Sequence, residues 1–402
     1  MANVSSSNGL EKRPKLRFPG FDEPYKQCHI GDIYAERSQR GASDMELLSV
    51  TMNDGVMPRS EIEGKDNSSE DKSNYKVVLT GDMVYNSMRM WQGANGISPC
   101  DGIVSPAYTV LMPKIPISNG YFAAFFKSPN LINEFRKNSQ GMTSDTWNLK
   151  YPQIETIKVC IPALSEQNRV ADMLRTLERR IAKQAQLVDN LKKYKRGVMQ
   201  RIFRQLPSQN GTEWTCVRLG DIFKKVSRRN TDGVIKNVIT NSAEYGLIPQ
   251  RDFFDKDIAV DGNTANYYVI ENGDFVYNPR KSNSAPYGPF NRYTLSEQGI
   301  ISPLYTCLVL QADISPSYLA WYFKSDAWYR YIYDNGSQGV RHDRVSMTDD
   351  LLMGIPVMYP SHVKQLLYAD ILDMVEARLQ ATQKTLDLLS KTRDGYMRQL
   401  FI

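Results

Sequence analysis

Two stretches of the chain repeat apolar residues at spacings that alternate between three and four. The first lies within Ser165–Gln205, and the second runs from Ser361 to the C-terminus with the same pattern shifted by 198 residues. This is the seam of a coiled coil, and each stretch can form a helix of roughly 40 residues, about 60 Å long. The predicted seam residues are Leu174, Leu177, Ile181, Val188 and Leu191 in the first helix, and Leu372, Val375, Leu379, Leu386 and Leu389 in the second.

The starts of these helices follow from the polar residues before them. Ser165 and Ser361 are expected to be the N-caps, since a serine hydroxyl can accept a backbone N–H of the first turn. Two such helices favour an intramolecular antiparallel pair with one globular part at each end. The alternative is that each helix packs on its own globular part, and the length of the seam argues against it.

The remaining sequence consists of short β-branched and aromatic runs broken by Gly, Pro, Asn and Ser. "NYKVVLTGDMVYNS" and "ANYYVIENGDFVYNP" are two examples, and their pattern predicts strands joined by turns. A short amphipathic helix is expected over Asn119–Phe135 and another over Pro316–Tyr333.

An internal duplication relates the two halves. "GIVSPAYTVL" (Gly102–Leu111) returns as "GIISPLYTCL" (Gly299–Leu308), and further pairs such as "GVMQRIF" and "GYMRQLF" follow in the same order. A Ser-Pro pair between β-branched residues is expected to turn or end a strand. The pattern predicts an α+β chain of two duplicated α/β domains separated by two long antiparallel coiled-coil helices, with pseudo-twofold symmetry.

Composition narrows the class of protein. The 402 residues predict two or three domains, and a net charge of +6 permits a nucleic-acid partner without requiring one. Five scattered cysteines and three histidines do not have the spacing of a metal site. The N-terminus does not resemble a signal peptide, and no apolar run reaches the ~18 residues of a membrane span. We therefore expect a cytoplasmic protein without a metal.

Catalytic signatures are scarce. The sequence contains neither a Walker A loop nor a Gly-x-Gly-x-x-Gly motif. "YNPR" at Tyr277–Arg280 is similar to the Asn-Pro-Pro-aromatic motif of amino-methyltransferases, but its second proline and its aromatic residue are missing. A turn at the end of a strand is the simpler interpretation, and we predict no catalytic residue in this chain.

Two pairs of matched loops have side chains suited to DNA. "NSMRMWQGANG" (Asn86–Gly96) corresponds to "NPRKSNSAPYG" (Asn278–Gly288), and "SQGMTSDTWN" corresponds to "SQGVRHDRVS". Arginine can bind guanine with two hydrogen bonds, and Asn or Gln can bind adenine. For the second pair a structural role is equally open, because Gly141 and Gly339 permit a positive φ. The candidate DNA-binding residues are Asn86, Arg89, Trp91, Gln92, Gln140, Thr143, Asn278, Arg280, Lys281, Asn283, Gln338, Arg341 and Arg344.

The first long helix is strongly basic. Between Glu166 and Arg204 it has 11 Lys and Arg against 4 Asp and Glu. Such a run is most often a solvated face, and it could instead bind DNA phosphates or an acidic partner surface.

Together these motifs resemble one known family. "PKLRFPGF" at Pro14, the two "GDI" strand starts, the segment from Asn86, "IPALSEQNRVADML" at Ile161 and the helix end "YKRGVMQRIF" are similar to the specificity subunit of type I restriction–modification systems. The resemblance covers nearly the whole chain. It implies an N-terminal tail (1–20), target recognition domains at 21–163 and 207–360, and spacer helices at 164–206 and 361–402. One departure is the helix start after Pro162, where the proline-rich hinge is less clear than in the second copy.

The resemblance also implies a function. Each recognition domain would bind one half of a split target in double-stranded DNA, and the helices would set the gap between the halves. Two modification subunits holding S-adenosylmethionine would dock on the chain and methylate adenine, and restriction subunits would add an ATP- and Mg-dependent nuclease. The chain itself would be a non-catalytic subunit without a cofactor. The alternatives are a coiled-coil scaffold that binds DNA without sequence preference and a divergent stand-alone DNA methyltransferase or nuclease.

Overall fold

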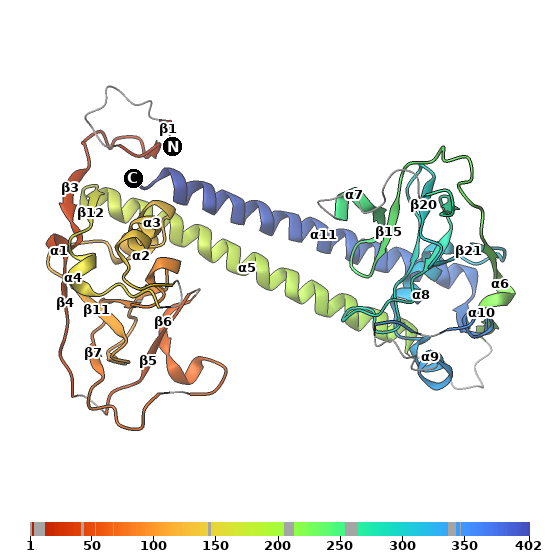
Figure 1. The fold of residues 1–402 in the computed structure, drawn as a ribbon, viewed down its shortest axis with the longest axis horizontal. Coiled ribbons are helices and arrows are strands. Elements are labelled where there is room, and N and C mark those ends of the chain that lie inside the picture. Colours follow the sequence, from red (N-terminus) through yellow and green to blue (C-terminus); the bar gives the residue numbers. More distant parts are fainter. Residues whose placement is uncertain are drawn as a thin grey trace. The chain divides into compact units, whose positions relative to one another are not determined.

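The chain folds into two compact units that share both long helices (Figure 1). The first unit comprises Met1–Gln186 and Gln383–Ile402, and the second comprises Leu187–Thr382. The computed structural model describes residues 2–3, 13–41, 44–52, 54–66, 68–143, 146–204, 213–253, 264–336, 343–345 and 347–402. The long helices are α5 (Leu164–Phe203) and α11 (His362–Gln399).

The first unit is built around a four-stranded antiparallel sheet with the strand order β4-β11-β8-β9. Its elements besides the long helices are β1 (Ala2–Asn3), β2 (Leu16–Arg17), β3 (Lys26–His29), α1 (Ile30–Ile33), β4 (Tyr34–Glu36), β5 (Leu48–Thr51), β6 (Gly55–Pro58), η1 (Arg59–Glu61), β7 (Lys76–Val78), β8 (Met83–Asn86), η2 (Met90–Gln92), β9 (Asn95–Ile97), β10 (Gly102–Val104), β11 (Tyr108–Pro113), α2 (Asn119–Phe125), α3 (Pro129–Asn138), α4 (Tyr151–Ile154) and β12 (Lys158–Ile161).

The second unit repeats this plan, with the strand order β14-β21-β18-β19. Three two-stranded sheets also correspond, because β7-β10, β5-β6 and β3-β12 match β17-β20, β15-β16 and β13-β22. The duplication is therefore confirmed strand by strand. The elements are β13 (Trp214–Arg218), α6 (Leu219–Ile222), β14 (Phe223–Val226), β15 (Ile239–Ser242), β16 (Gly246–Pro249), α7 (Gln250–Phe253), β17 (Tyr268–Ile270), β18 (Phe275–Tyr277), β19 (Phe290–Arg292), β20 (Gly299–Ile301), β21 (Thr306–Leu310), α8 (Pro316–Lys324), α9 (Tyr329–Asn335), α10 (Asp349–Met353) and β22 (Pro356–Pro360).

The repeated Ser-Pro pair turns the chain between two strands, as predicted. In the first unit it joins β10 to β11, and the N–H of Tyr108 donates to the Ser105 carbonyl at 2.9 Å. In the second unit it joins β20 to β21, with Tyr305 and Ser302 in the same contact at 3.1 Å. Proline is tolerated here because its position lies outside both strand ladders.

The two "GDI" segments are not strand starts, and that prediction was wrong. Each forms one helical turn, α1 or α6, directly before β4 or β14. The aspartate explains the turn, since Asp32 accepts the N–H of His29 at 2.8 Å and Asp221 accepts that of Arg218 at 2.8 Å. A carboxylate three residues into a turn satisfies a free N–H and favours the helix dipole.

The expected single helices over Asn119–Phe135 and Pro316–Tyr333 are each two helices. The first breaks between α2 and α3, where Ser128 and Pro129 begin a new helix, and proline cannot continue the preceding one. In the second unit, the hydroxyl of Ser325 donates to the Tyr322 carbonyl at 2.6 Å and ends α8. The prediction of helical structure is confirmed in both regions, but local caps divide each predicted helix into two.

The helix starts also differ from one prediction. Helix α5 begins at Leu164, so Ser165 lies inside the first turn, and the backbone carbonyl of Ala163 accepts the N–H of Gln167 at 3.0 Å. Ser165 is therefore not the N-cap. Ser361 directly precedes α11, and its carbonyl makes the same contact with Gln365 at 3.0 Å. The chain thus enters the first helix directly after Pro162-Ala163, whereas a serine directly precedes α11.

The predicted seam positions are the shielded side of both long helices. All ten of them are buried or half-buried, whereas Leu187 and Leu388 lie outside the seam and are exposed. Within each unit, the two helix segments pair antiparallel. In the first unit, Glu178 faces Arg393 at 3.8 Å, and in the second unit Lys195 binds Glu376 at 2.8 Å. Lys195 lies 17 residues after Glu178 in α5, and Glu376 lies 17 residues before Arg393 in α11. Both units therefore use the same pairing register.

Aromatic side chains fasten the end of one long helix into each β-rich part. Phe203, at the end of α5, is 1% exposed and contacts the rings of Tyr318 and Tyr322 with centroid distances of 5.8 and 5.9 Å. Phe401, just beyond α11, makes equivalent contacts of 5.3 and 5.4 Å with Tyr121 and Phe125. Fully burying a phenylalanine contributes about 1.5–3 kcal/mol, so each contact is a substantial anchor.

A buried glutamine fastens the start of the other long helix. Gln167 of α5 accepts the N–H of Ser118 at 3.0 Å and donates to the carbonyl of Pro162 at 2.9 Å. In the second unit Gln365 of α11 makes the matching bonds to Ser315 and Pro360 at 2.8 and 2.9 Å. Each glutamine therefore ties the N-terminal end of α2 or α8 to a long helix.

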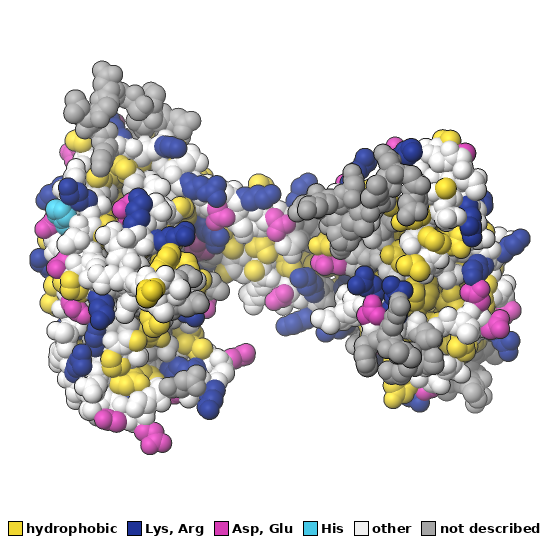
Figure 2. Space-filling view, viewed as in Figure 1, with side chains coloured by type: hydrophobic (Ala, Val, Ile, Leu, Met, Phe, Trp, Pro, Cys, Tyr) yellow, Lys and Arg dark blue, Asp and Glu magenta, His cyan; other side chains and the backbone are white. Residues whose placement is uncertain are grey.

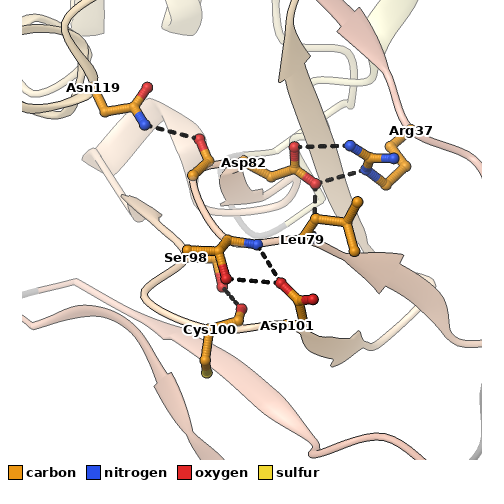
Figure 3. Close-up of polar contacts among 9 residues, drawn as sticks. Arg37, Leu79, Asp82, Ser98, Cys100, Asp101 and Asn119 are labelled. Atoms are coloured by element: carbon orange, nitrogen blue, oxygen red, sulfur yellow. Dashed lines mark hydrogen bonds and ion pairs between the residues drawn. The ribbon is translucent and has the colours of Figure 1, made fainter.

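Both units also have an aspartate that closes the turn before β8 or β18. Asp82 is 3% exposed and accepts two bonds from the Arg37 guanidinium, at 2.6 and 3.1 Å, and one from the N–H of Leu79 at 2.9 Å (Figure 3). The side chain of Asn119, also drawn there, donates to a carbonyl of the same turn at 3.2 Å. Asp274 holds the matching turn by accepting the N–H of Glu271 at 2.9 Å.

Replacing Asp82 with alanine should lower the free energy of unfolding by about 3 kcal/mol, because it leaves the Arg37 charge and a turn N–H without their acceptor. Denaturant unfolding measures this value. Asp101→Ala is the matched control, since Asp101 is exposed and, among the described residues, its carboxylate accepts hydrogen bonds from Thr80 alone. Equal losses in both variants would contradict the structural role of Asp82.

Candidate nucleic-acid interface

The two predicted loops of the second unit meet each other. The N–H of Val345 donates to the Pro279 carbonyl at 2.9 Å, and the N–H of Lys281 donates to the Asp343 carbonyl at 2.9 Å. These bonds set Arg280 opposite Arg344 in an antiparallel bridge. Like charges placed opposite each other on a sheet are unfavourable, and an anion between them removes the penalty. The arrangement therefore suits a negatively charged ligand.

A recess adjoins this bridge. It has a volume of about 460 Å³ and is lined by Lys281, Ser282, Asn283, Pro286, Tyr287, Tyr333 and Asp343. Its wall combines hydrogen-bonding groups with two tyrosine rings, and the ring of Tyr287 packs on Tyr329 with a centroid distance of 5.0 Å. Amide, ammonium and aromatic groups together can contact both phosphates and base edges.

The corresponding loops of the first unit also meet. The N–H of Leu149 donates to the Ser87 carbonyl at 2.8 Å, which places the segment after Ser139 against the segment after β8. The indole rings of Trp91 and Trp147 then pack edge to face at 5.2 Å, and the guanidinium of Arg136 lies over Trp147 at 5.3 Å. The first unit thus presents a cation on an aromatic pair where the second presents two arginines.

The predicted DNA-binding residues differ in accessibility. Arg89, Gln140, Thr143, Arg280 and Asn283 are exposed, and Asn86, Trp91, Gln92, Lys281 and Arg344 are half-buried. Gln338 and Arg341 lie outside the described residues. For every residue of this set, contact with DNA stays a prediction.

Asn278 is the least accessible member of the set. It is 6% exposed, its amide donates to the Asn241 carbonyl at 3.2 Å, and its side-chain oxygen accepts the N–H of Arg280 at 3.0 Å. The hydroxyl of Tyr277 donates to the Tyr287 carbonyl at 2.8 Å. "YNPR" is therefore a turn at the end of β18 that supports the loop, as the simpler interpretation predicted. Similarly, Asn86 uses its side-chain oxygen to accept the N–H of Met88 at 3.0 Å.

Sequence reasoning missed several residues of the interface. Trp147 and Tyr287 stood inside the quoted loops but were not selected, because their importance comes from contacts with Trp91 and Tyr329. Arg136 lies on α3, outside both loops. Only the aromatic character of the loops could have pointed to the first two. Gly141 has a φ of +145°, so the positive φ expected there is confirmed, and Gly339 lies outside the described residues.

Cys307, which is buried, and Cys28, which is half-buried, both have thiols with a raised pKa. Burial raises the pKa of the Cys307 thiol to about 12, and burial together with Asp32 raises the pKa of Cys28. A protonated thiol is a weak nucleophile and a weak metal ligand. Within the described ranges, no three or more His, Cys, Asp or Glu side chains gather where they could hold a metal ion. None of the helices in those ranges is long and apolar enough to cross a membrane.

The comparisons with known proteins agree on the fold. No protein-family model matches the chain. It is similar to the crystal structure of a type I restriction–modification system S subunit from M. genitalium, with 14% identity, a TM-score of 0.57, and coverage of 97% of this chain and 99% of that one. An HsdS subunit from Thermoanaerobacter tengcongensis is similar at 15% identity and a TM-score of 0.50, covering 96% and 97% of the two chains. A chain from a structure described as the basis of complex assembly and conformational transition of the type I R-M system matches at 15% identity and a TM-score of 0.55, covering 96% and 99%. The predicted fold is therefore confirmed over nearly the full length.

The stability of the two contacting loops in the second unit should depend on Gly288. This residue has a φ of +86°, and a Cβ there would lie 2.0 Å from the Asn278 carbonyl oxygen. Gly288→Ala should lower the free energy of unfolding by about 2–3 kcal/mol more than Gly273→Ala, because it adds a backbone clash to the usual left-handed strain. Gly273, at φ +99°, has open space around its Cβ position and is the matched control. Equal unfolding curves would refute the close approach.

Proposed function

We propose that this chain is the DNA-specificity subunit of a type I restriction–modification enzyme. Each β-rich unit would recognise one half of a bipartite target in double-stranded DNA and direct partner subunits to methylate or cleave it. The likeness to S subunits supports this at the level of the fold. The resemblance of the sequence motifs adds independent support.

One observation carries the proposal. In both units the same two segments meet beside the same turn, yet their side chains differ: Arg280 faces Arg344 in one, and Trp91 packs on Trp147 in the other. Base edges are distinguished by the side chains that contact them, whereas a scaffold need only position those side chains. Two copies of one scaffold with different loops suit a target made of two different half-sites.

The partners and cofactors belong to the same proposal. Two modification subunits would bring S-adenosylmethionine, and restriction subunits would bring ATP and Mg²⁺, in the cytoplasm. One structural neighbour comes from a study of type I R-M complex assembly, which supports partners of this kind. The chain itself would supply recognition and geometry and would hold no cofactor.

The alternative functions would require different features of the chain. A coiled-coil scaffold that binds DNA without sequence preference would not need loops that differ between the two units. A stand-alone methyltransferase or nuclease would need a cofactor loop or a metal cluster, and it would act on DNA as the purified single chain. Binding of S-adenosylmethionine by this chain alone would support that alternative.

Co-expression with the adjacently encoded modification subunit tests the function directly. Single-molecule sequencing of host DNA should then reveal methylated adenines in a split motif, with two short half-sites around a fixed gap. The required control is a purified complex shown to assemble and to bind S-adenosylmethionine. No new methylation from such a complex would contradict the recognition role.

Replacing Arg89 or Arg280 with alanine should affect one half-site only. Arg89 is exposed in the first unit and Arg280 in the second, so each variant is the control for the other. If the arginine contacts a base, recognition of its half-site should weaken by about 1–3 kcal/mol and relax at that position. Methylation maps and binding to duplexes with single half-site changes measure the effect. Simultaneous loss at both half-sites would exclude two separate modules.

The long helices should set the gap between half-sites. One heptad inserted into Gln184–Leu191, with a second inserted into α11 between Glu376 and Arg393, keeps the seam pairing intact. Each helix then lengthens by about 10 Å, and the methylated gap should grow by roughly three base pairs. Insertion into α5 alone should break the pairing and abolish assembly. An unchanged gap in the double insertion would contradict the role of the helices as a spacer.

A further inference from the structure

A basic pocket lies in the second unit, where α5 passes the end of α8. It has a volume of about 430 Å³ and is lined by Lys192, Lys195, Arg196, Met199, Gln200, Lys324, Ser325, Asp326 and Tyr329. Residues 192, 196 and 199 follow helical spacing and therefore share one face of α5. On the face drawn in Figure 2, Lys and Arg side chains gather on and beside the long-helix part of this unit.

The charges in this pocket are only partly neutralised. Lys195 is paired with Glu376 at 2.8 Å, and the Asp326 carboxylate is bound by Arg204. Within the part of the chain that the structure describes, Lys192, Arg196 and Lys324 form no salt bridge. Lys324 is an exposed residue whose ammonium lies over the Trp321 ring at 4.8 Å, and partial desolvation there lowers the pKa of Lys324, against the opposing influence of Glu376. An anion in the pocket would offset this cost.

The duplicated unit offers an internal comparison. Lys127 corresponds to Lys324, and the 198-residue shift places Arg393 and Asp394 of α11 at the positions of Lys195 and Arg196. These residues line a pocket of about 930 Å³ in the first unit, together with Asp172 and Glu178 among others. There Arg393 contacts both Asp394, at 2.8 Å, and Glu178. The first pocket thus has three acidic residues against four basic ones, whereas the second has one against four.

The basic pocket and the recess of the candidate interface are linked by one aromatic contact. Tyr329 lines it and packs on Tyr287, which lines the recess beside Lys281 and Asn283. A duplex held by that recess would bring its backbone past the same tyrosine pair. Phosphates are the anions such a duplex presents, and Lys and Arg bind them without regard to sequence.

We propose that Lys192, Arg196 and Lys324 form a phosphate-binding pocket for the DNA backbone next to the half-site recognised by the second unit. This inference rests on the proposed function, because it takes the neighbouring loops as the recognition surface. The pocket would hold the duplex in place and contribute affinity, while the loops would supply sequence preference. The first unit would lack an equivalent contact, so the two half-sites would be held unequally.

The test compares two double variants in the complex with the modification subunits. Lys192→Gln with Arg196→Gln removes two charges from the pocket. Lys193→Gln with Arg201→Gln is the matched control, because it removes one Lys and one Arg from exposed positions of the same helix outside the pocket. Binding to cognate and unrelated duplexes is measured over a series of salt concentrations, and unfolding curves confirm that both variants fold.

The pocket variant should lower the slope of log K against log salt by about 1–2, close to 0.9 per lost phosphate contact, and should weaken cognate and unrelated DNA equally. The control should change the slope by much less. Equal slopes in the two variants would overturn the proposal. Loss of modification-subunit binding with an unchanged DNA slope would also overturn it, because the pocket would then dock an acidic protein surface.

Failure of the proposed function gives a different result. A wild-type complex that binds all duplexes equally would contradict sequence recognition. The difference between the two variants on that DNA would still decide whether the pocket binds phosphate.

Discussion

The structure depends on how firmly the ends of the long helices are held in the β-rich parts. A helix can act as a spacer only if its ends cannot rotate or slide, and a seam of leucines alone does not prevent sliding. Phe203 and Phe401 are buried among aromatic rings, and Gln167 and Gln365 tie the opposite helix ends to α2 and α8. Buried amides are costly to leave unpaired, so these bonds specify one orientation. Each β-rich part is thereby fixed to the helix segments of its own unit.

The two copies keep these anchors and differ elsewhere. The sheet orders, the Ser-Pro turns and the aspartate turns correspond, while the exposed side chains of the loops do not. The two units also differ beside the buried glutamines. The first unit has the buried ion pair Arg17–Glu166 there, whereas the second has the ion pair Lys364–Glu213 at its surface. Close packing limits which side chains the core can contain, whereas side chains at exposed positions can vary with the ligand that they bind. The divergence therefore lies where two different half-sites would be bound.

The distribution of charged side chains also differs between the two units. The basic residues of α5 differ in their surroundings: Lys192 and Arg196 line a pocket with Lys324, whereas Arg175 and Lys195 pair with acids. In the first unit the corresponding pocket carries its own carboxylates. A count of charges along the helix cannot separate these cases, since the decisive neighbours come from α8 and α11. The two units thus share a fold and differ in the charge that surrounds these pockets.

Features that repeat over short distances could be predicted from the amino-acid pattern alone. The seam spacing, the order of the duplicated motifs, the Ser-Pro turns and the positions of the loops are local patterns, and the backbone responds to them directly. The pattern did not predict the breaks between α2 and α3 and between α8 and α9, and it placed the cap of α5 at Ser165. At these points a single serine, proline or carbonyl determines where the helix begins or ends. Three features could not be predicted in this way: the two loops of each unit meet, Asn278 is buried, and Arg196 and Lys324 line one pocket. These residues are far apart in the chain, and packing brings them together.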